Sequence, residues 1–307
     1  WALTENERDN EGAMSEETGW KGIFAVLQTP LTDSDEIDMG VMARQVEFSV
    51  ACKSDGLVYP VLGGEFQYLT EQERNDSLKV VCDVTAGRIP VVAGVAAPSR
   101  AVAASLARSA ADAGADALVA LPPYISPASL DQVMDYFRAI ADASGLPIMV
   151  QHARIVPLPP PFLVRLLTEI DEVKYIKEER EPSAHNLTQV INDVGDACLG
   201  IFGGGHGRWM MSEMERGSSG FMPAVQTLDL YVKTWAAFQA GDKVEARRLY
   251  DAHLPLINQL LMVGLQVCKE VLVRRGVFDN NIMRTPGAVQ MDEGDHLGHE
   301  DEAGAAS

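Results

Sequence analysis

Lys177 is the residue whose type and position point most directly to chemistry. It ends the run Val173–Lys177, in which side chains alternate with the period of a β-strand. In an extended chain Val173, Tyr175 and Lys177 share one face, so a core filled by the first two places the lysine at its end. Burial disfavours the charged form of a lysine, and the neutral amine is a nucleophile that forms a Schiff base with a ketone. We therefore predict that Lys177 forms an imine; the alternative is a solvated lysine at a strand end.

Two glutamates follow Lys177 directly. Glu179 shares the face of Lys177 if the chain stays extended, so its carboxyl group could serve the imine as a general acid or base. Glu178 has the opposite parity and is not assigned a role. The alternative is that both carboxylates only complement the positive end of a following helix. Lys177 and Glu179 are the candidate catalytic residues.

Polar side chains also follow two other apolar runs. Gln151 and His152 end the run that begins at Pro147, and Tyr124 closes the segment Leu-Pro-Pro-Tyr. An amide can hydrogen-bond a substrate hydroxyl or carboxylate but does not transfer protons, whereas an imidazole can. Gln151, His152 and Tyr124 are therefore candidate substrate-binding residues, although the histidine and the tyrosine could equally be packed and hydrogen-bonded structural groups.

Two glycine clusters complete the candidate site. Gly63 and Gly64 follow one apolar run, and Gly204 and Gly205 lie within the glycine-rich segment 203–207 that follows another. Glycine lets backbone N–H groups approach an anion such as a substrate carboxylate, although turns use glycine for conformational reasons as well.

His185, His253, His296 and His299 show no metal-ligand spacing, so no metal site and no cofactor are predicted.

The strands and helices that position these residues are indicated by the sequence pattern. Short β-branched runs, typical of strands, alternate along the chain with longer amphipathic segments, typical of helices. The expected strands are 23–28, 56–61, 89–95, 117–121, 147–151, 173–177, 199–202 and 220–222, and the expected helices between them include 39–52, 71–86, 100–113, 130–143 and 161–170. Eight such units predict a (β/α)₈ TIM barrel, whose active site lies at the carboxyl ends of the strands. A doubly wound sheet is the alternative, but no G-x-G-x-x-G motif follows the first strand.

The chain divides into four expected parts. Segment 1–20 is acidic and expected to be disordered, 21–225 forms the barrel, 226–285 forms a C-terminal helical appendage, and 286–307 is an acidic, disordered tail. Within the appendage, 227–240, 243–261 and 264–275 have the pattern of three consecutive helices. Segments 1–20 and 286–307 each contain six Asp or Glu residues, and Arg8 is the only Lys or Arg in either segment.

The composition limits the classes of partner. A net charge of −19 argues against nucleic acid and against an anionic membrane surface. No segment approaches the roughly 20 apolar residues that a membrane span needs. Four well-separated cysteines are typical of a reducing compartment, which predicts a cytoplasmic protein whose partner is a small molecule.

Taken together, these residues resemble the dihydrodipicolinate synthase/N-acetylneuraminate lyase family of Schiff-base barrels. The similarity runs from residue 21 to about residue 276, and Lys177 stands where the family has its imine lysine. It is carried by Gly22-Ile-Phe, Thr29-Pro30, Asp55-Gly56-Leu57-Val58, Gly64-Glu65, Leu69-Thr70, Glu73-Arg74, Gly87-Arg88-Ile-Pro-Val-Val-Ala-Gly94, Gly114-Ala-Asp-Ala117 and Pro122-Pro123-Tyr124. The resemblance implies a 2-keto acid substrate and a homo-oligomer, a tetramer or a dimer.

Departures from the family pattern narrow the expected activity. Members with the lysine-pathway activity have paired threonines where this chain has Leu62 and Gly63, and tyrosines where it has Gln151 and Ile125. A hydroxyl proton relay cannot run through these side chains, so dihydrodipicolinate synthase activity is not expected. The sialate-lyase activity of the family depends on the same tyrosine, which this chain lacks.

The chain is most similar to the 2-keto-3-deoxy-L-arabonate dehydratase branch. The shared features are Pro147-Ile-Met-Val-Gln151, the spacing of Lys177 and Glu179, and Leu254-Pro-Leu-Ile-Asn258, whereas His152 replaces an acidic residue of that branch. The expected function is dehydration of a 2-keto-3-deoxy sugar acid through a lysine Schiff base. The alternatives are a pyruvate-releasing class I aldolase and a non-catalytic protein that binds keto acids.

Overall fold

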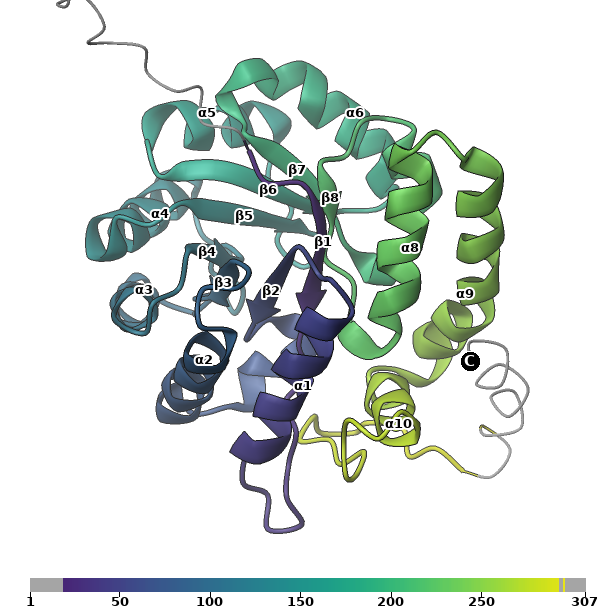
Figure 1. The fold of residues 1–307 in the computed structure, drawn as a ribbon. Coiled ribbons are helices and arrows are strands. Elements are labelled where there is room, and N and C mark those ends of the chain that lie inside the picture. The colour runs from purple at the N-terminus through teal and green to yellow at the C-terminus, as the bar shows by residue number, and fades with distance from the viewer. Residues whose placement is uncertain (1–18, 293–294, 296–307) are drawn as a thin grey trace, which may run out of the picture.

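Eight parallel strands close into a barrel in which each strand pairs with the next and β8 returns to β1 (Figure 1). The computed structural model describes residues 19–292 and residue 295. The strands are β1 (Gly22–Val26), β2 (Gly56–Tyr59), β3 (Val91–Gly94), β4 (Ala117–Ala120), β5 (Ile148–Ala153), β6 (Val173–Glu179), β7 (Gly200–Gly203) and β8 (Gly220–Phe221). This arrangement confirms the predicted (β/α)₈ barrel.

Helices surround the barrel and begin at capping residues where the sequence offers them. They are α1 (Met39–Ala51), α2 (Glu71–Thr85), α3 (Arg100–Asp112), α4 (Leu130–Ser144), α5 (Pro160–Glu169), α6 (Ser183–Val194), α7 (Met210–Met214), α8 (Leu228–Gln239), α9 (Lys243–Val263) and α10 (Gln266–Arg274). Thr70 and Glu73 form a capping box at α2, as Ser129 and Gln132 do at α4. Short 3₁₀ turns η1 (Leu62–Gly64) and η4 (Gly205–Gly207) follow β2 and β7.

Alternate side chains of the strands fill the interior of the barrel or face the helices. The interior cluster contains Phe24, Val26, Val58, Val61, Val92, Ala117, Val119, Met149, Tyr175, Phe202 and Met222. Tyr175 therefore fills the barrel as predicted, but Val173 packs in the outer layer with the helices. The reason is a register shift: Ile148 pairs with Val173 and Met149 with Tyr175, so β6 has an additional residue at this step.

Trp20 corrects the expected extent of the disordered N-terminal segment. Its ring stacks on Tyr175 at 5.2 Å between centroids and lies 5.6 Å from Phe24. Because it precedes β1, it covers the amino-terminal end of the barrel interior. The rest of the segment expected to be disordered, residues 1–18, lies outside the described residues.

The helices after β8 extend the molecule on one side, where α8 and α9 lie side by side and α10 follows below them (Figure 1). Helix α8 also contacts β1 and so completes the ring of helices around the barrel. Met291 N donates to Gln266 Oε1 at 2.9 Å, and the Gln266 amide bonds Gln290. The described part of the expected acidic tail is thus attached to α10, and its remaining residues lie outside the description.

A buried ion pair fastens the C-terminal segment to the loop after β2. Glu65 Oε2 accepts from Lys269 Nζ at 2.7 Å, and each side chain is 1% exposed. Glu65 Oε1 accepts from Arg284 N at 2.9 Å and from Thr285 N and Oγ1 at 2.8 and 2.7 Å. Burial lowers the pKa of Lys269, and the charge of Glu65 opposes that shift.

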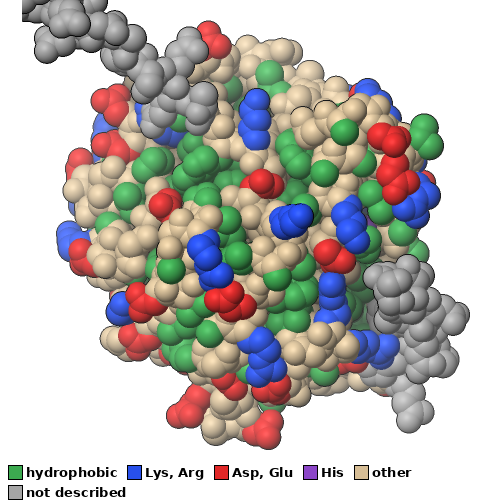
Figure 2. Space-filling model, viewed as in Figure 1, with side chains coloured by type: hydrophobic (Ala, Val, Ile, Leu, Met, Phe, Trp, Pro, Cys, Tyr) green, Lys and Arg blue, Asp and Glu red, His purple; other side chains and the backbone are tan. Residues whose placement is uncertain are grey.

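Acidic and basic side chains are interspersed over the face shown in Figure 2, and apolar groups lie between them. Within the described residues, no helix combines the length and the apolar character needed to cross a lipid bilayer.

Glu65→Gln tests the buried ion pair. The amide can still accept hydrogen bonds but leaves the Lys269 ammonium without a counter-charge, so the free energy of unfolding should fall by about 3–5 kcal/mol. Urea unfolding measures this change. Glu47→Gln is the matched control, because Glu47 pairs with Arg88 on the surface, where removal of a charge has little effect. Equal stability of the two variants would contradict the assigned role of Glu65.

Candidate active site

A cavity of about 250 Å³ opens at the carboxyl ends of the strands. Strands β1, β5 and β6, the segment after β8, the turns η1 and η4, and the residue before α10 contribute to its wall. The lining residues are Val26, Leu62, Gly63, Gln151, Lys177, Glu179, Gly205, His206, Met222, Ala224 and Leu265. Four of them carry polar side chains, and all four lie on or after β5, β6 and β7.

Lys177, Glu179 and Gln151 form one hydrogen-bonded group in this cavity. Lys177 Nζ lies 3.2 Å from Glu179 Oε1, and the lysine side chain is 4% exposed. Gln151 Nε2 donates to Glu179 Oε2 at 2.5 Å, and Gly205 N donates to Glu179 Oε1 at 3.1 Å. The carboxylate therefore accepts from three donors on three consecutive strands or their loops.

The surroundings of Glu179 keep it ionised. Burial raises its pKa, but the Lys177 ammonium and the hydrogen bonds from Gln151 and Gly205 outweigh burial, so the pKa lies below its usual value. At neutral pH Glu179 is thus a carboxylate, and it lies 3.2 Å from Lys177 Nζ, where it can accept a proton. A carboxylate in this state is a base rather than an acid in the absence of substrate.

His206 is a cavity residue to which sequence reasoning gave no role. Its backbone is left-handed, with φ of 58°, and its carbonyl accepts from Tyr231 Oη at 2.7 Å. Nδ1 is buried without a hydrogen-bond partner among the described residues. Burial lowers the pKa of His206 to about 4, so the ring is neutral at pH 7. The only sequence signal was its position inside the glycine run 203–207.

The structure brings five of the nine predicted site residues into the cavity wall: Gly63, Gln151, Lys177, Glu179 and Gly205. Gly204 lies directly behind Glu179, where a Cβ atom would come within 2.1 Å of Oε1. Gly64 is buried, and its carbonyl accepts from Thr29 Oγ1 at 2.6 Å. These two glycines support the site without lining the cavity.

His152 lies elsewhere, which corrects its expected contact with substrate, and Tyr124 is not among the residues that line this cavity. His152 follows the inward-facing Gln151, so it points to the outer layer, where it is fully buried and bonds Glu178. Tyr124 packs edge-on against Phe66 at 5.8 Å and is not part of the cavity wall.

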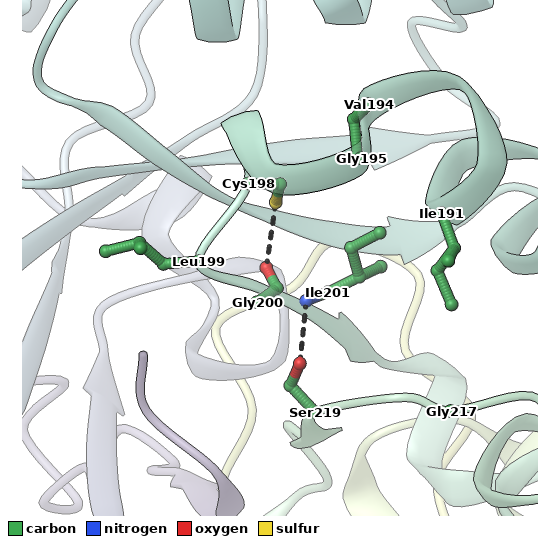
Figure 3. A pocket seen from close by; sticks show the side chains of 9 residues that line it. All are labelled: Ile191, Val194, Gly195, Cys198, Leu199, Gly200, Ile201, Gly217 and Ser219. Atoms are coloured by element: carbon green, nitrogen blue, oxygen red, sulfur yellow. Dashed lines mark hydrogen bonds between the residues drawn. The ribbon is translucent and has the colours of Figure 1, made fainter. Parts of the chain in front are cut away.

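A second hollow, of about 170 Å³, lies near the opposite end of β7 (Figure 3). Cys198 and Ser219 line it, with Sγ directed to Gly200 O and Oγ accepting from Ile201 N. Burial raises the pKa of the Cys198 thiol to about 11, so it is protonated and weakly nucleophilic at neutral pH.

Among the residues that the structure describes, no group of three or more His, Cys, Asp or Glu side chains is arranged to hold a metal ion.

A profile of the dihydrodipicolinate synthetase family matches residues 19–299. The chain belongs to this family. The finding confirms the resemblance seen in the sequence and covers the barrel, the cavity and the C-terminal helices.

Individual relatives agree with this assignment. The chain is 30% identical to the L-2-keto-3-deoxyarabonate dehydratase of Azospirillum brasilense over 272 residues, 87% of this chain and 88% of that one. It is 29% identical to the N-acetylneuraminate lyase of Rhizobium meliloti, with 87% of each chain covered. The crystal structure of dihydrodipicolinate synthase from Rhodopseudomonas palustris superposes with a TM-score of 0.84 at 28% identity, covering 92% of this chain and 97% of that one.

The lowered pKa of His206 predicts a pH dependence of stability. Unfolded histidine titrates near pH 6.5, so between about pH 6.5 and 4 the unfolded chain binds a proton that folded His206 does not. The free energy of unfolding contributed by this residue therefore falls as the pH falls through that range. His206→Asn should reduce the loss of stability between pH 7 and pH 4.5, because asparagine tolerates the left-handed backbone and carries no titratable ring.

Urea unfolding of the parent and the variant at the two pH values measures this difference. His185→Asn makes the same change on the exposed face of α6 and serves as the control for the substitution itself. A loss of stability that is as large in His206→Asn as in the parent would contradict the prediction.

Proposed function

We propose that this chain is a Schiff-base lyase that acts on a 2-keto-3-deoxy sugar acid, and that its reaction is dehydration. The observation that supports this most strongly is the buried Lys177 ammonium 3.2 Å from an ionised carboxylate at the carboxyl ends of barrel strands. Membership of the family, which includes a relative named as a keto-deoxyarabonate dehydratase, points to the same chemistry.

The reaction begins at Lys177. Glu179 Oε1 is positioned to accept the proton that the ammonium must lose before the amine can attack the C2 ketone. The carbinolamine hydroxyl group takes that proton back from Glu179 and leaves as water, which gives an iminium ion on Nζ and restores the carboxylate. The lysine itself supplies the electrophile, so the proposed reaction needs no metal or organic cofactor.

Glu179 then carries the proton transfers. The iminium ion acidifies the C3–H bond, and the carboxylate removes that proton to give an enamine. The enamine expels the C4 hydroxyl group, which leaves as water after taking the proton from Glu179. Hydrolysis of the unsaturated iminium ion uses one water, frees Lys177 and releases the dehydrated 2-keto acid, so the overall change is the loss of one water.

The other cavity residues have supporting roles in the proposal. Gln151 holds Glu179 through its amide and cannot itself transfer a proton. His206 lines the cavity, and its neutral side chain can contact the hydroxyl groups of the sugar chain. The backbone at Gly63 and Gly205 leaves space for the substrate carboxylate and chain.

Retro-aldol cleavage to pyruvate and an aldehyde is the second candidate. It uses the same imine but needs a base on the C4 hydroxyl, and His206 is a neutral histidine in the cavity wall. A non-catalytic keto-acid-binding role is the third alternative, and the Lys177–Glu179 ion pair weighs against it. Dihydrodipicolinate synthase activity is not proposed, because Leu62 and Gln151 occupy the wall where that activity needs hydroxyl groups.

We also propose that the chain acts as a homo-oligomer, a tetramer or a dimer, in the cytoplasm. Oligomerisation is supported by the assembly that is usual in the family. A reducing compartment is supported by the four free cysteines, because burial raises the pKa of all four thiols and so keeps them protonated at neutral pH.

Borohydride trapping tests the imine. Incubation with pyruvate and borohydride should leave one reduced adduct on the parental chain, located by peptide mass spectrometry at Lys177. Lys177→Ala should take up no label, whereas the control Lys174→Ala, on the same strand, should label like the parent. Labelling of Lys177→Ala would show that another group forms the imine.

Glu179→Gln tests the base. The variant should still form the imine, although more slowly because water must replace Glu179 as the acceptor of the ammonium proton, but turnover of the hydroxylated substrate should fall about 10²–10⁴-fold, the usual contribution of a positioned acid or base. Exchange of deuterium into C3 should fall in parallel. The matched control is Glu181→Gln, two residues away, where the carboxylate pairs with Arg208 and lies outside the cavity wall. Turnover of Glu179→Gln close to that of the parent would remove Glu179 from the mechanism.

A panel of 2-keto-3-deoxy sugar acids analysed by mass spectrometry distinguishes the three functions. A product smaller by one water without carbon loss supports the dehydratase, and pyruvate release supports the aldolase. Thermal stabilisation by the panel without any turnover supports the binding protein.

A further inference from the structure

The ends of β5 and β6 carry two polar pairs, one on each face of the barrel wall. In the strand register Gln151 is opposite Lys177 and His152 is opposite Glu178. Successive side chains of a strand point to opposite faces. Gln151 and Lys177 therefore face the cavity, whereas His152 and Glu178 face the layer of helices.

The outer pair is completely buried. His152 Nδ1 lies 2.7 Å from Glu178 Oε2, both side chains have an exposed fraction of 0%, and Glu178 Oε1 accepts from Arg180 N at 2.8 Å. His152 Nε2 has no hydrogen-bond partner among the described residues. An apolar pair of similar volume would fill this space with equal or greater stability, so stability alone does not explain a hydrogen-bonded polar pair here.

More buried polar groups extend the pair along the outer face. Ser183 Oγ donates to Glu213 Oε1 at 2.5 Å, and burial raises the pKa of Glu213 to about 7. Glu213 lies directly behind Gly203, where a Cβ atom would come within 2.1 Å of its Oε2. The outer support thus reaches from β5 to β7, whose following loop holds Glu179 through Gly205.

The strands that carry these pairs are also the longest in the barrel. β5 and β6 contain six and seven residues, whereas the others contain two to five. Their additional length places Gln151 two residues before the position opposite Glu179, because Ala153 is the residue paired with Glu179. The bond between Gln151 and Glu179 is therefore diagonal and depends on how closely the two strand ends approach each other.

We propose that the His152–Glu178 hydrogen bond is a positioning element that fixes the ends of β5 and β6 from behind and so holds Gln151 against Glu179. The inference rests on the proposed function of Lys177 and Glu179. His152 and Glu178 do not touch substrate; they act through the two side chains on the opposite face of the same strands. Loss of the outer bond lets the strand ends separate, and the C3 base then lies out of place.

The test uses one variant that breaks the bond and one that keeps it. His152→Leu with Glu178→Leu removes both polar groups together, which avoids an unpaired buried charge and should preserve the melting temperature. His152→Asn keeps a nitrogen donor near the position of Nδ1. Each variant is measured for kcat and KM with the sugar acid that the parent turns over, and for pyruvate labelling of Lys177 by borohydride.

The double variant should lose about 10–100-fold in kcat, the scale expected when a catalytic group is misplaced by about an ångström. Its KM should change less than about threefold, and labelling of Lys177 should persist, because the lysine is unchanged and water can take the ammonium proton where Glu179 is displaced. His152→Asn should keep kcat within about threefold of the parent. This separation of kcat from KM, with rescue by the conservative variant, is not expected of a pair that only fills space.

Two outcomes would overturn the positioning role: parental kcat in a folded double variant, or a folded His152→Asn as slow as the double variant. A double variant that fails to fold would also overturn it, because the bond would then be needed for stability. Failure of the parental chain to label at Lys177 would instead contradict the proposed function itself. The two hypotheses are thus decided by different measurements.

Discussion

The candidate active site is arranged around one buried charge, that of Lys177, and the carboxylate that compensates it. The Lys177 ammonium is almost completely removed from water, and a charge in such a place requires a partner. Glu179 supplies it, and the carboxylate is in turn held by donors from β5 and from the loop after β7. The barrel makes this possible because parallel strands deliver all their carboxyl ends to one rim, so groups about thirty residues apart in sequence meet there.

The period of the strands made much of this arrangement accessible from the sequence. The shared parity of Tyr175 and Lys177 was enough to place Lys177 inside, and the parity of Glu179 was enough to place it beside the lysine. The same parity should have excluded His152, because a residue next to the inward-facing Gln151 must face outward. The assignment of Val173 to the interior was wrong because β6 shifts its register opposite Ile148. That shift depends on the neighbouring strand, so the periodicity of β6 alone does not reveal it.

Other features depend on contacts that no local pattern encodes. His206 enters the cavity through a left-handed backbone between glycines, a conformation that neither helix nor strand periodicity indicates. Glu65 meets Lys269 across a separation of 204 residues, and the sequence offered only a glutamate after two glycines. Such long-range pairs are decided by the complete fold, which is why the proximity of Lys177 and Glu179 was predictable and much of the surrounding cavity wall was not.

The order in which the chain is synthesised has a consequence for when the cavity exists. Leu265 forms part of its wall, and the η1 loop that bears Gly63 is fastened through Glu65 to residues 269–285. A nascent chain that has released all eight strands from the ribosome still lacks these groups. The wall of the cavity therefore cannot be complete until residues 265–285 have been synthesised, although every strand of the barrel has been made by then.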